Sequence, residues 1–478
     1  MPYSGWRVLI SALSVRGLRS ILKFMHSSLI LSGVVLSIAA ASASVVGDVI
    51  GDERSVLDRM REPTFPAVEF LITDHGAVAG CDCSQAIASA IRACHAAGGG
   101  RVTIPAGTWR TGPVRLQSNV ELHLREHATL TFDSEPAKYL PVVLTRFEGM
   151  DYMNYAPLIL AVEQENIAVT GRGTLDGGAS AEAWWPWKGK RGSGPSQKEA
   201  RNRLVQQVAD GVPPADRLYG DGHFMRPNFI QPQRCKGVLI EGVTIVNSPM
   251  WVIHPLLCTN VTVRGVTVKS LGPNNDGCNP ESCRDVLIED CLFETGDDCI
   301  AIKSGRNDDG RRVAVPSDNI VIRRCTMKDG HGGVTIGSEV SGDVRNVFVS
   351  DCRMDSPNLD RAFRFKSNAV RGGVIENVHF RDVTIGRVAK AVLGIEFDYD
   401  EGADGPHRPV LRNVSIERVT SASSGTAIDI GSFPAATITD IRIKDSTFRG
   451  VEGPGRMSHV GSLILENVAI EPAQKGKK

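Results

Sequence analysis

The sequence predicts an all-β chain wound into a parallel β-helix, a solenoid in which each coil lies on the one before it. Three observations lead to this fold class: a short phrase recurs along the chain, period-2 strands separate its copies, and the composition favours turns. Of 478 residues, 49 are Gly and 25 are Pro, while only 6% are aromatic. This balance suits a turn-rich β protein better than a helical bundle.

The recurring phrase is a polar residue, often Asn, then Val or Ile, then any residue, then an aliphatic residue or Phe. Its copies from residue 237 to residue 440 are 23, 25, 34, 27, 31, 36 and 27 residues apart, within the range of about 20–50 that is typical of stacked repeats. A unit this short cannot bury its own apolar row, so it must lie on the next unit, with Val on Val and Asn on Asn. A propeller is the alternative, but its blades need about 40–45 residues. The phrase begins at Asn119, Asn166, Gly237, Asn260, Asp285, Asn319, Asn346, Asn377, Asn413 and Asp440.

The first 43 residues have the pattern of a secretory signal peptide. Arg19 and Lys23 precede an apolar run of 13 residues from 29 to 41, and Ala41-Ser42-Ala43 follows as a cleavage pattern. The run is shorter than the roughly 20 residues that cross a membrane. We therefore expect cleavage near Ser44 and export to the periplasm or the cell exterior, with Met25 as an alternative start.

A helix is predicted ahead of the repeat, where it would cover the open end of the solenoid. Ile87, Ile91 and Cys94 have helical spacing, and Ser84 is a possible N-cap. The predicted divisions of the chain are a signal peptide (1–43), a linker (44–63), an N-terminal cap region (64–118), a β-helix domain that holds the candidate site (119–471) and a basic tail (472–478).

Charge and cysteine content exclude several classes of protein. The 54 Lys and Arg balance the 54 Asp and Glu, which excludes a strongly basic nucleic-acid binder, and the 42% of hydrophobic residues exclude a disordered chain. None of the 11 cysteines forms a C-x-x-C pair, and most lie beside β-branched residues. We expect them in the core, and we predict neither a metal site nor a cofactor.

Four segments in consecutive coils combine acids, a histidine and bases. Strands of neighbouring coils lie about 4.8 Å apart, so residues far apart in the sequence can share one patch. Strand parity places the apolar residues of these strands in the core. It places on the outer face Asp297, Lys303, His331, Arg364 and Lys366, in contrast to the inward-facing Ile300, Ile302, Phe363 and Phe365. The segments are Asn274-Asn275-Asp276-Gly277, Gly296-Asp297-Asp298 continuing to Lys303, Gly330-His331-Gly332-Gly333, and Arg364-Phe365-Lys366.

Asp298 does not fit this parity, because it falls on the same side as Ile300. Either the backbone turns at residues 296–298 or the carboxylate is buried. An unpaired buried carboxylate is costly, so we predict the turn.

The four segments, in this order, resemble the N-T-D, G/Q-D-D, G-H-G and R-I-K motifs of glycoside hydrolase family 28, the polygalacturonases. Asn275 replaces Thr and Phe365 replaces Ile, and the resemblance extends from about residue 98 to residue 470. It implies a right-handed parallel β-helix that hydrolyses α-1,4-galacturonosyl bonds with inversion. In that mechanism Asp297 is the acid, Asp276 and Asp298 hold the water, and His331 tunes the acid.

The resemblance also implies residues that bind substrate. Arg364 and Lys366 are suited to the carboxylate of a uronic acid, and Asn275 and Lys303 lie in the same motifs. Tyr399 matches the Tyr-containing loop of the family, although the parity of its strand points it inward. The expected partner is an acidic plant cell-wall polysaccharide or an oligogalacturonide, with no nucleic acid and no membrane.

Other activities stay open at this point. One alternative is a rhamnogalacturonan or xylogalacturonan hydrolase. A pectate lyase would share the β-helix and the substrate but needs Ca²⁺ ligands and a basic proton acceptor, and a binding protein of the adhesin type needs no acids. An insertion from Gly178 to Gly222 and a polar loop from Arg306 to Ser317 predict exo-action by closing one end of the site. The insertion contains Trp184, Trp185 and Trp187, which either stack on a terminal sugar or pin the insertion to the body of the solenoid.

Overall fold

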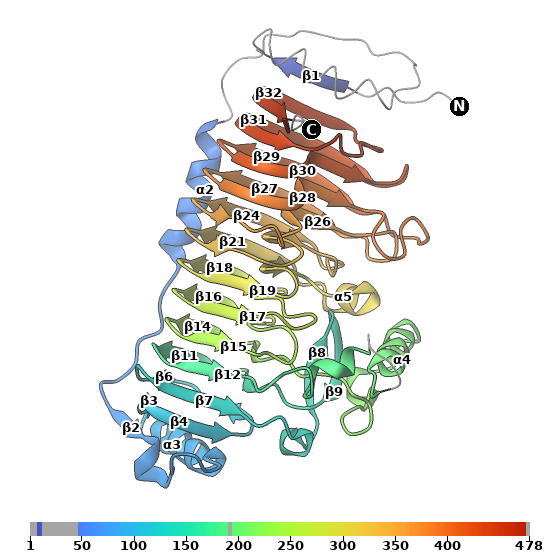
Figure 1. The fold of residues 1–478 in the computed structure, drawn as a ribbon. Coiled ribbons are helices and arrows are strands. Elements are labelled where there is room, and N and C mark those ends of the chain that lie inside the picture. The colour runs from blue at the N-terminus through green and yellow to red at the C-terminus, as the bar shows by residue number, and fades with distance from the viewer. Residues whose placement is uncertain (1–6, 12–45, 190–193, 475–478) are drawn as a thin grey trace.

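The structure, a computed structural model, describes residues 7–11, 46–189 and 194–474. It is a right-handed parallel β-helix, as the sequence predicts, and Figure 1 shows its coils stacked along one axis. Most of the predicted signal peptide and of the basic tail lie outside the described residues. Within that predicted peptide, β1 (Arg7–Ser11) pairs in parallel with β32, so cleavage near Ser44 would remove the terminal strand of the stack.

Three parallel sheets run along the axis, and most coils contribute a strand or a single bridge to each sheet. The first sheet contains β2 (Glu69–Leu71), β3 (Gly100–Ile104), β6 (Val120–Leu124), β11 (Glu165–Gly171), β14 (Lys236–Glu241), β16 (Thr259–Arg264), β18 (Arg284–Glu289), β21 (Ser317–Arg323), β24 (Val344–Ser350), β27 (Val374–Arg381), β29 (Val410–Glu417), β31 (Thr437–Val451) and β32 (Ser462–Pro472). The second contains β4 (Gly107–Thr111), β7 (Ala128–Phe132), β12 (Thr174–Asp176), β15 (Thr244–Val246), β17 (Thr267–Ser270), β19 (Leu292–Thr295), β22 (Thr326–Met327), β25 (Arg353–Met354), β28 (Thr384–Glu396) and β30 (Thr420–Gly431).

The third sheet is built from shorter strands and single bridges. Ile253 and Cys278 form isolated bridges that continue it between β13 and β20, and the distal part of β28 extends it beyond β26. Its strands are β5 (Val114–Arg115), β10 (Ile159–Val162), β13 (Ile230–Gln233), β20 (Ile300–Ile302), β23 (Val334–Ile336) and β26 (Arg361–Lys366).

The polar residue of the repeated phrase forms a ladder along the first sheet. Asn319, Asn346, Asn377 and Asn413 all have left-handed φ values of 52° to 59°, a conformation that Asn tolerates better than most residues. Each side-chain amide donates a hydrogen bond to the Asn of the preceding coil. Asn346 Nδ2 donates to Asn319 Oδ1 at 3.3 Å, and Asn377 Nδ2 donates to Asn346 Oδ1 at 3.0 Å. The predicted stacking of Asn on Asn is confirmed.

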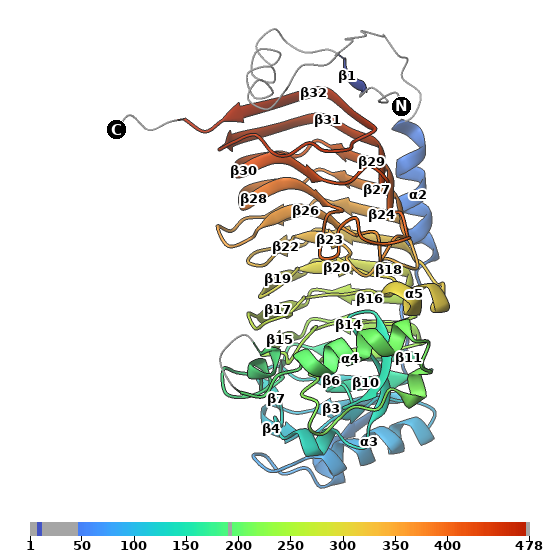
Figure 2. The ribbon, with the colours of Figure 1, turned by 90° about the vertical axis from the view of Figure 1, so that its right-hand side faces the viewer.

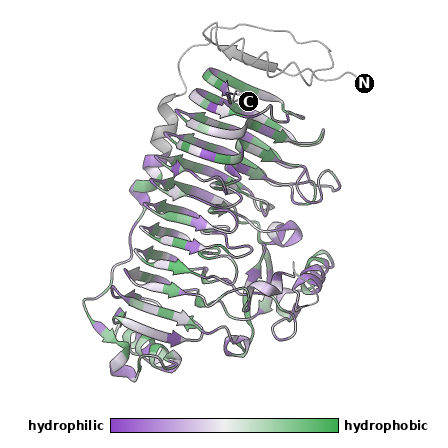
Figure 3. Cartoon of the chain, viewed as in Figure 1, coloured by the Kyte–Doolittle hydropathy of each residue, from purple (hydrophilic) through white to green (hydrophobic). Residues whose placement is uncertain are grey.

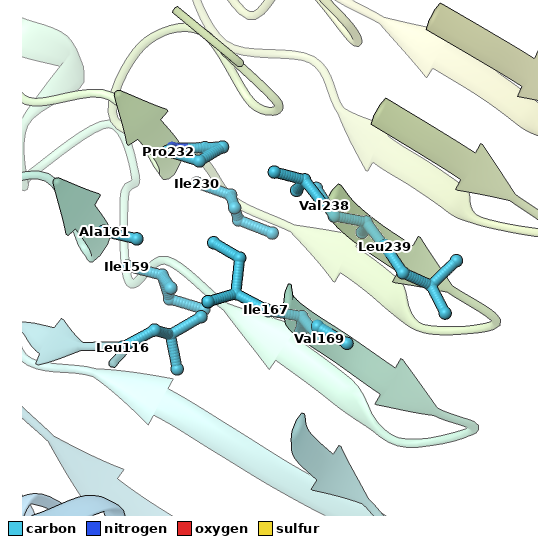
Figure 4. Close-up of a pocket in the computed structure, with 11 residues that line it drawn as sticks. Leu116, Ile159, Ala161, Ile167, Val169, Ile230, Pro232, Val238 and Leu239 are labelled. Carbon is cyan, nitrogen blue, oxygen red and sulfur yellow. The ribbon is translucent and has the colours of Figure 1, made fainter. Parts of the chain in front are cut away.

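Apolar side chains from successive coils fill the interior. Figure 4 shows five of these side chains, from successive coils, that point into the interior: Leu116, Ile159, Ile167, Ile230 and Val238. The alternation of polar and apolar residues along the strands is visible in Figure 3. Ten of the 11 cysteines are buried, and all 11 are free thiols, which agrees with their predicted place in the core.

The N-terminal part differs in two ways from the sequence prediction. The segment predicted as a linker contains α2 (Val46–Arg59), which lies along the first sheet (Figure 1). Val56 packs on Leu287, Val321 and Phe348, so an apolar stripe on the outside of the coils holds this helix. The β-helix begins earlier than residue 119, because β3 already pairs with β6.

The predicted cap helix is present as α3 (Ser84–Ala96), which follows the short helix η1 (Ile72–His75) and buries Ile87, Ile91 and Cys94. Ser84 is not its N-cap. The Asp82 carboxylate accepts the Ser84 amide at 2.9 Å, and the Ser84 hydroxyl instead accepts the Gly112 amide at 2.7 Å.

An assembly of loops leaves the coils on the side of the third sheet, as Figure 2 shows. It comprises an antiparallel hairpin that sequence reasoning missed, the predicted insertion, and a helix within the predicted polar loop. Its elements are η2 (Pro136–Tyr139), β8 (Val143–Phe147), β9 (Met150–Asn154), η3 (Trp185–Lys188), α4 (Lys198–Ala209), η4 (Pro214–Asp216) and α5 (Asn307–Val313). None of the described helices is both long and apolar enough to cross a membrane.

The ladder predicts a specific pattern of stabilities. Asn346→Ala removes three side-chain hydrogen bonds and places Ala at φ 56°, so we expect a loss of about 2–3 kcal/mol. Asn346→Gly should lose about 1 kcal/mol less, because Gly adopts this conformation freely. Thermal and urea unfolding measure both variants. Asn202→Ala, on the exposed face of α4, is the control, and an Asn346→Ala protein as stable as the control would contradict the ladder.

Candidate active site

The third sheet brings the four predicted segments together. Ile300 of β20 pairs with Val334 of β23, which pairs with Phe363 of β26, and Cys278 bridges to Ile300 on the other side. Because residues 300 and 334 are in register, His331 stands beside Asp297 on the next coil. Asp276 precedes the bridge at Cys278 by two residues. The coil register therefore places these motifs within hydrogen-bond reach of one another.

Asp297 and His331 form the exposed part of the site. His331 Nδ1 lies 2.9 Å from Asp297 Oδ1, and the imidazole is half-exposed whereas Asp297 retains 18% of its side-chain exposure. Their hydrogen bond raises the pKa of His331. Burial acts to raise the pKa of Asp297, but the hydrogen bond and charge of His331, together with Lys366, outweigh it and hold that pKa below its ordinary value.

Asp298 is buried and paired, so the two alternatives considered for it are not exclusive. The backbone bends at residues 296–298 before β20 begins, and the Asp298 side chain is nevertheless only 1% exposed. Lys366 Nζ donates to Oδ2 at 2.8 Å, Thr335 Oγ1 donates to Oδ1 at 2.8 Å and Arg364 lies 3.4 Å from Oδ1. Burial opposes ionisation, but Lys366, Arg364 and Lys303 outweigh it and lower the pKa of Asp298.

Asp276 has the opposite electrostatic environment. It is buried, and burial together with the Asp297 and Asp298 carboxylates raises its pKa well above the ordinary value, although Lys303 acts against this. Asn279 Nδ2 donates to its Oδ2 at 2.8 Å, and Lys303 Nζ lies 3.7 Å away. Three carboxyl groups thus lie in environments that separate their pKa values, which is the arrangement that acid/base chemistry needs.

Lys303 lies beneath the site and not on its surface. Its ammonium donates to Glu339 Oε2 at 2.9 Å and stands 4.7 Å from the centre of the Trp251 ring, with 4% of the side chain exposed. Burial opposes its charge, but Glu339 and Asp276 raise the pKa of Lys303. This buried position does not fit the predicted contact between Lys303 and substrate. It does place the ammonium where its charge acts on Asp276.

Two further predicted residues differ from expectation. Asn275 is fully buried. Its side-chain amide accepts the Ser270 hydroxyl of its own coil at 2.7 Å and donates to the Met250 carbonyl of the preceding coil at 3.1 Å. It therefore shapes the turn and has no exposed surface for substrate. Tyr399 does not point inward, because β28 ends at Glu396 and parity no longer applies. Its ring lies 5.4 Å from Lys366 Nζ, on the site side.

Sequence reasoning missed several partners of the predicted bases and acids. Glu396 pairs in register with Lys366 and accepts Arg364 Nε at 2.6 Å. Thr335 pairs in register with Arg364 and bonds Asp298. Both lie one coil from a motif residue, so aligning the strands by their inward-facing residues would have identified them. Glu339 gives no such signal, because it follows β23 in an irregular segment.

The tryptophans of the insertion pin it to the body. Trp184 is 2% exposed within the core, and Trp187 packs on it with ring centres 4.8 Å apart. The indole of Trp185 donates to the Ser248 carbonyl at 2.9 Å. These three side chains therefore do not form a wall on which a terminal sugar could stack.

The two buried acids predict opposite effects of neutralisation on stability. The folded pKa of Asp298 is lowered, so its contribution is complete above the unfolded value of about 3.9 and is lost as the pH falls through the folded value. At neutral pH, Asp298→Asn leaves the buried Lys366 without its carboxylate partner, whereas Arg364 keeps Glu396, and the substitution should cost about 3 kcal/mol. The folded pKa of Asp276 is raised, so ionisation opposes folding and Asp276→Asn should be neutral or stabilising.

Denaturation at neutral and acidic pH measures this difference, which should shrink as the pH falls and the carboxyl groups become protonated. Equal destabilisation by both substitutions at neutral pH would contradict the assigned charge states.

Comparison with known proteins agrees with this geometry. The family model described as "Glycosyl hydrolases family 28" matches residues 220–460. A probable polygalacturonase of Vitis vinifera is 28% identical over 73% of this chain and 67% of its own, and an exo-poly-alpha-D-galacturonosidase of Dickeya chrysanthemi is 26% identical over 76% of this chain and 62% of its own. The solved structure of a hyperthermoactive exopolygalacturonase from Thermotoga maritima is 42% identical, with a TM-score of 0.84, over 88% of this chain and 96% of that one. The chain belongs to glycoside hydrolase family 28.

Proposed function

We propose that this protein hydrolyses the α-1,4-galacturonosyl bonds of polygalacturonan and acts from the chain end. The observation that carries the proposal is the carboxyl cluster beside two bases. Asp276, Asp297 and Asp298 lie just before their coils enter the third sheet. Arg364 and Lys366 lie on β26 of the same sheet, further along the stack, and contact Asp298. One carboxylic acid and one carboxylate are what glycoside hydrolysis requires.

The exposed member of the cluster is suited to meet the glycosidic oxygen. Of the three acids, Asp297 has the greatest side-chain exposure, 18% against 4% for Asp276 and 1% for Asp298. His331 stabilises the carboxylate that remains after Asp297 gives up its proton. We assign Asp297 as the general acid, and Asp276 and Asp298 as the groups that hold the attacking water, which gives inversion.

In the free protein, the proton of the cluster resides preferentially on Asp276, whose pKa is raised, and not on Asp297. The proposed roles therefore require the proton to be on Asp297 when substrate is bound. A substrate that displaces water from Asp297 favours its neutral form. The cluster titrates as a coupled set, so one proton can shift between its members.

The bases of the site favour a polyanionic substrate. Arg364 and Lys366 are largely buried, and both face Asp298, while the Tyr399 ring centre lies 5.9 Å from the Arg364 guanidinium and 5.4 Å from Lys366 Nζ. Because the net charge of the chain is 0, recognition of a uronic acid depends on such local bases. We propose that a substrate carboxylate binds over Lys366 and Tyr399.

A calcium-dependent lyase is disfavoured by the same contacts. Both oxygens of Asp298 already face cations or a hydroxyl donor, and two fixed positive charges oppose the binding of a metal ion. A binding protein without activity is disfavoured because burying three acids together is costly.

The proposal is tested by incubating the purified protein with polygalacturonate and with a neutral glucan. We expect reducing ends from polygalacturonate alone, without the ultraviolet absorbance of an unsaturated product. Unsaturated product would identify a lyase, and no product would contradict the assigned activity. Rhamnogalacturonan and xylogalacturonan, offered in parallel, determine which pectin structure is preferred.

Asp297→Asn should reduce kcat on polygalacturonate by at least about 10²-fold, the usual scale of general acid catalysis. The substitution keeps the shape of the side chain, so the fold should persist. Initial rates of reducing-end release measure the effect. Asp290→Asn, an exposed aspartate on the first-sheet side paired with Arg324, is the matched control, and an Asp297→Asn protein with unchanged kcat would refute the acid assignment.

Exo-action is supported by the loop assembly beside the acids. Glu148 in the hairpin accepts Arg306 at 2.9 Å and Arg201 of α4 at 2.7 Å, while Arg217 and Asp309 form a buried ion pair. The hairpin, the insertion and α5 are thus joined by ion pairs. Arg306 follows Lys303 by three residues, so the assembly joins the chain directly after the segment that carries Asp297 and Asp298. Such an obstacle on one side would stop a polymer from passing through.

Viscosity compared with reducing ends determines the mode of attack. An exo-acting enzyme shortens chains by one end unit at a time, so we expect viscosity to fall slowly while many ends form. Early products should be galacturonic acid or a short oligomer from the non-reducing end. A steep fall in viscosity while few ends have formed would show internal cleavage and contradict exo-action.

A further inference from the structure

Arg226 is a buried arginine that connects the insertion to the turn carrying Asp276. It lies just after the insertion and is 1% exposed. Its Nε donates to Gln197 Oε1 in the insertion at 3.1 Å. The other end of the guanidinium donates to the Pro249 carbonyl at 2.9 Å, the Pro273 carbonyl at 2.7 Å and Asn274 Oδ1 at 2.8 Å. One side chain thus holds two successive turns of the third sheet and the insertion.

Arg226 interacts with the negative charges of Glu148 and Asp297 only through space. Within the described residues it forms no ion pair, since all four of its acceptors are carbonyl or amide oxygens. Burial lowers the pKa of Arg226 to about 10, so the guanidinium is still positive at neutral pH. Burying an unpaired cation is costly, and an apolar residue would fill the space without that cost. The hydrogen bonds to the turns are what distinguishes Arg from such a residue.

The turn that Arg226 holds is the one that positions Asp276. Asn274 adopts a left-handed φ of 57°. The buried side-chain oxygen Oδ1 of Asn275 accepts the backbone N–H of Gly272 at 3.0 Å, which closes the turn. Trp185 of the insertion packs so closely on Gly272 that a Cβ there would lie 2.2 Å from its ring. The insertion therefore presses on this turn through Trp185 and is tied to it through Arg226.

We propose that Arg226 is a positioning residue that fixes Asp276 and transmits the placement of the insertion to it. This rests on the proposed function, in that Asp276 holds the attacking water. The guanidinium has donors in a planar fork, so it can bond a turn on each of two coils and the insertion at once, which an ammonium cannot do. A displacement of about 1 Å in a catalytic group lowers rates by about 10²-fold.

Arg226→Lys tests the proposal, because it keeps the charge but loses the fork. We expect kcat on polygalacturonate to fall at least about 10-fold while KM stays within about 3-fold, since no substrate contact is removed. Arg203→Lys is the matched control. Arg203 belongs to the same insertion but is exposed, over the Tyr219 ring, and both parameters should stay unchanged. Unchanged kcat in folded Arg226→Lys, or a rise in KM alone, would overturn the proposal.

Gln197→Met removes the hydrogen bond between the insertion and Arg226 while leaving the other three bonds of Arg226 and the packing of Trp185 in place. We expect a smaller fall in kcat, of about 3-fold, and no further loss when it is combined with Arg226→Lys, because both act through one link. Fully additive effects would show that Arg226 holds the turn independently of the insertion and would overturn the coupling.

Hydrogen exchange gives a readout that does not depend on the substrate. Amides of residues 271–279 should exchange faster in Arg226→Lys than in the parent protein, while those of α3 stay unchanged. Unchanged exchange in 271–279 would overturn the positioning role, whatever the activity. Faster exchange in a protein whose parent does not hydrolyse polygalacturonate would instead refute the proposed function alone.

Discussion

The contacts of Asp297 and Asp298 with their partners depend on the in-register hydrogen bonding of one coil to the next. This constraint repeats each position of the coil at the spacing of adjacent strands, so a polar residue at one position meets its counterpart on the next coil. Asp297 and His331 are in contact because Ile300 and Val334 are paired. The Asn ladder on the opposite side of the coils follows the same rule. A shift of register in one coil would separate the acid from its histidine.

The stacked arrangement also determines the charges. The three acids lie on two successive coils, where they disfavour one another's ionisation. Arg364 and Lys366 lie further along the stack, on β26. Lys366 and Arg364 neutralise Asp298, while Lys303, which is shared with Glu339, lies at 3.7 Å from Asp276. Asp298 is therefore ionised and Asp276 favours its protonated form. Asp276 and Asp298 are both aspartates, and their charge states differ because their neighbours on adjacent coils differ.

Much of the fold and part of the site could be predicted from the sequence. The repeat interval and the alternation of apolar residues predicted the coils, the ladder and the buried cysteines, because these depend on local pattern. Parity placed Arg364 and His331 correctly but failed for Tyr399, since it applies only within a strand. The burial of Lys303 and Asn275 could not be predicted, because it depends on Glu339, Trp251 and the turn at residues 272–275, which lie outside the periodic segments.

The hairpin and α2 were missed for a related reason. Neither repeats, so neither has a counterpart elsewhere in the chain that would reveal it. Both are held by contacts between distant segments: Val56 packs on Phe348, and Glu148 pairs with Arg306. Sequence pattern therefore predicted the scaffold, whereas the hairpin and α2, which do not repeat, required the structure.

The central claim is that Asp297 protonates the leaving oxygen while Asp276 and Asp298 direct a water molecule to the opposite face of the sugar. The most direct test is to follow the anomeric proton signals of the product by NMR during the first turnovers, before mutarotation. The account predicts that the β-anomer of the new reducing end forms first from the α-linked substrate. Initial formation of the α-anomer would show retention and would contradict the assigned roles of the three carboxyl groups.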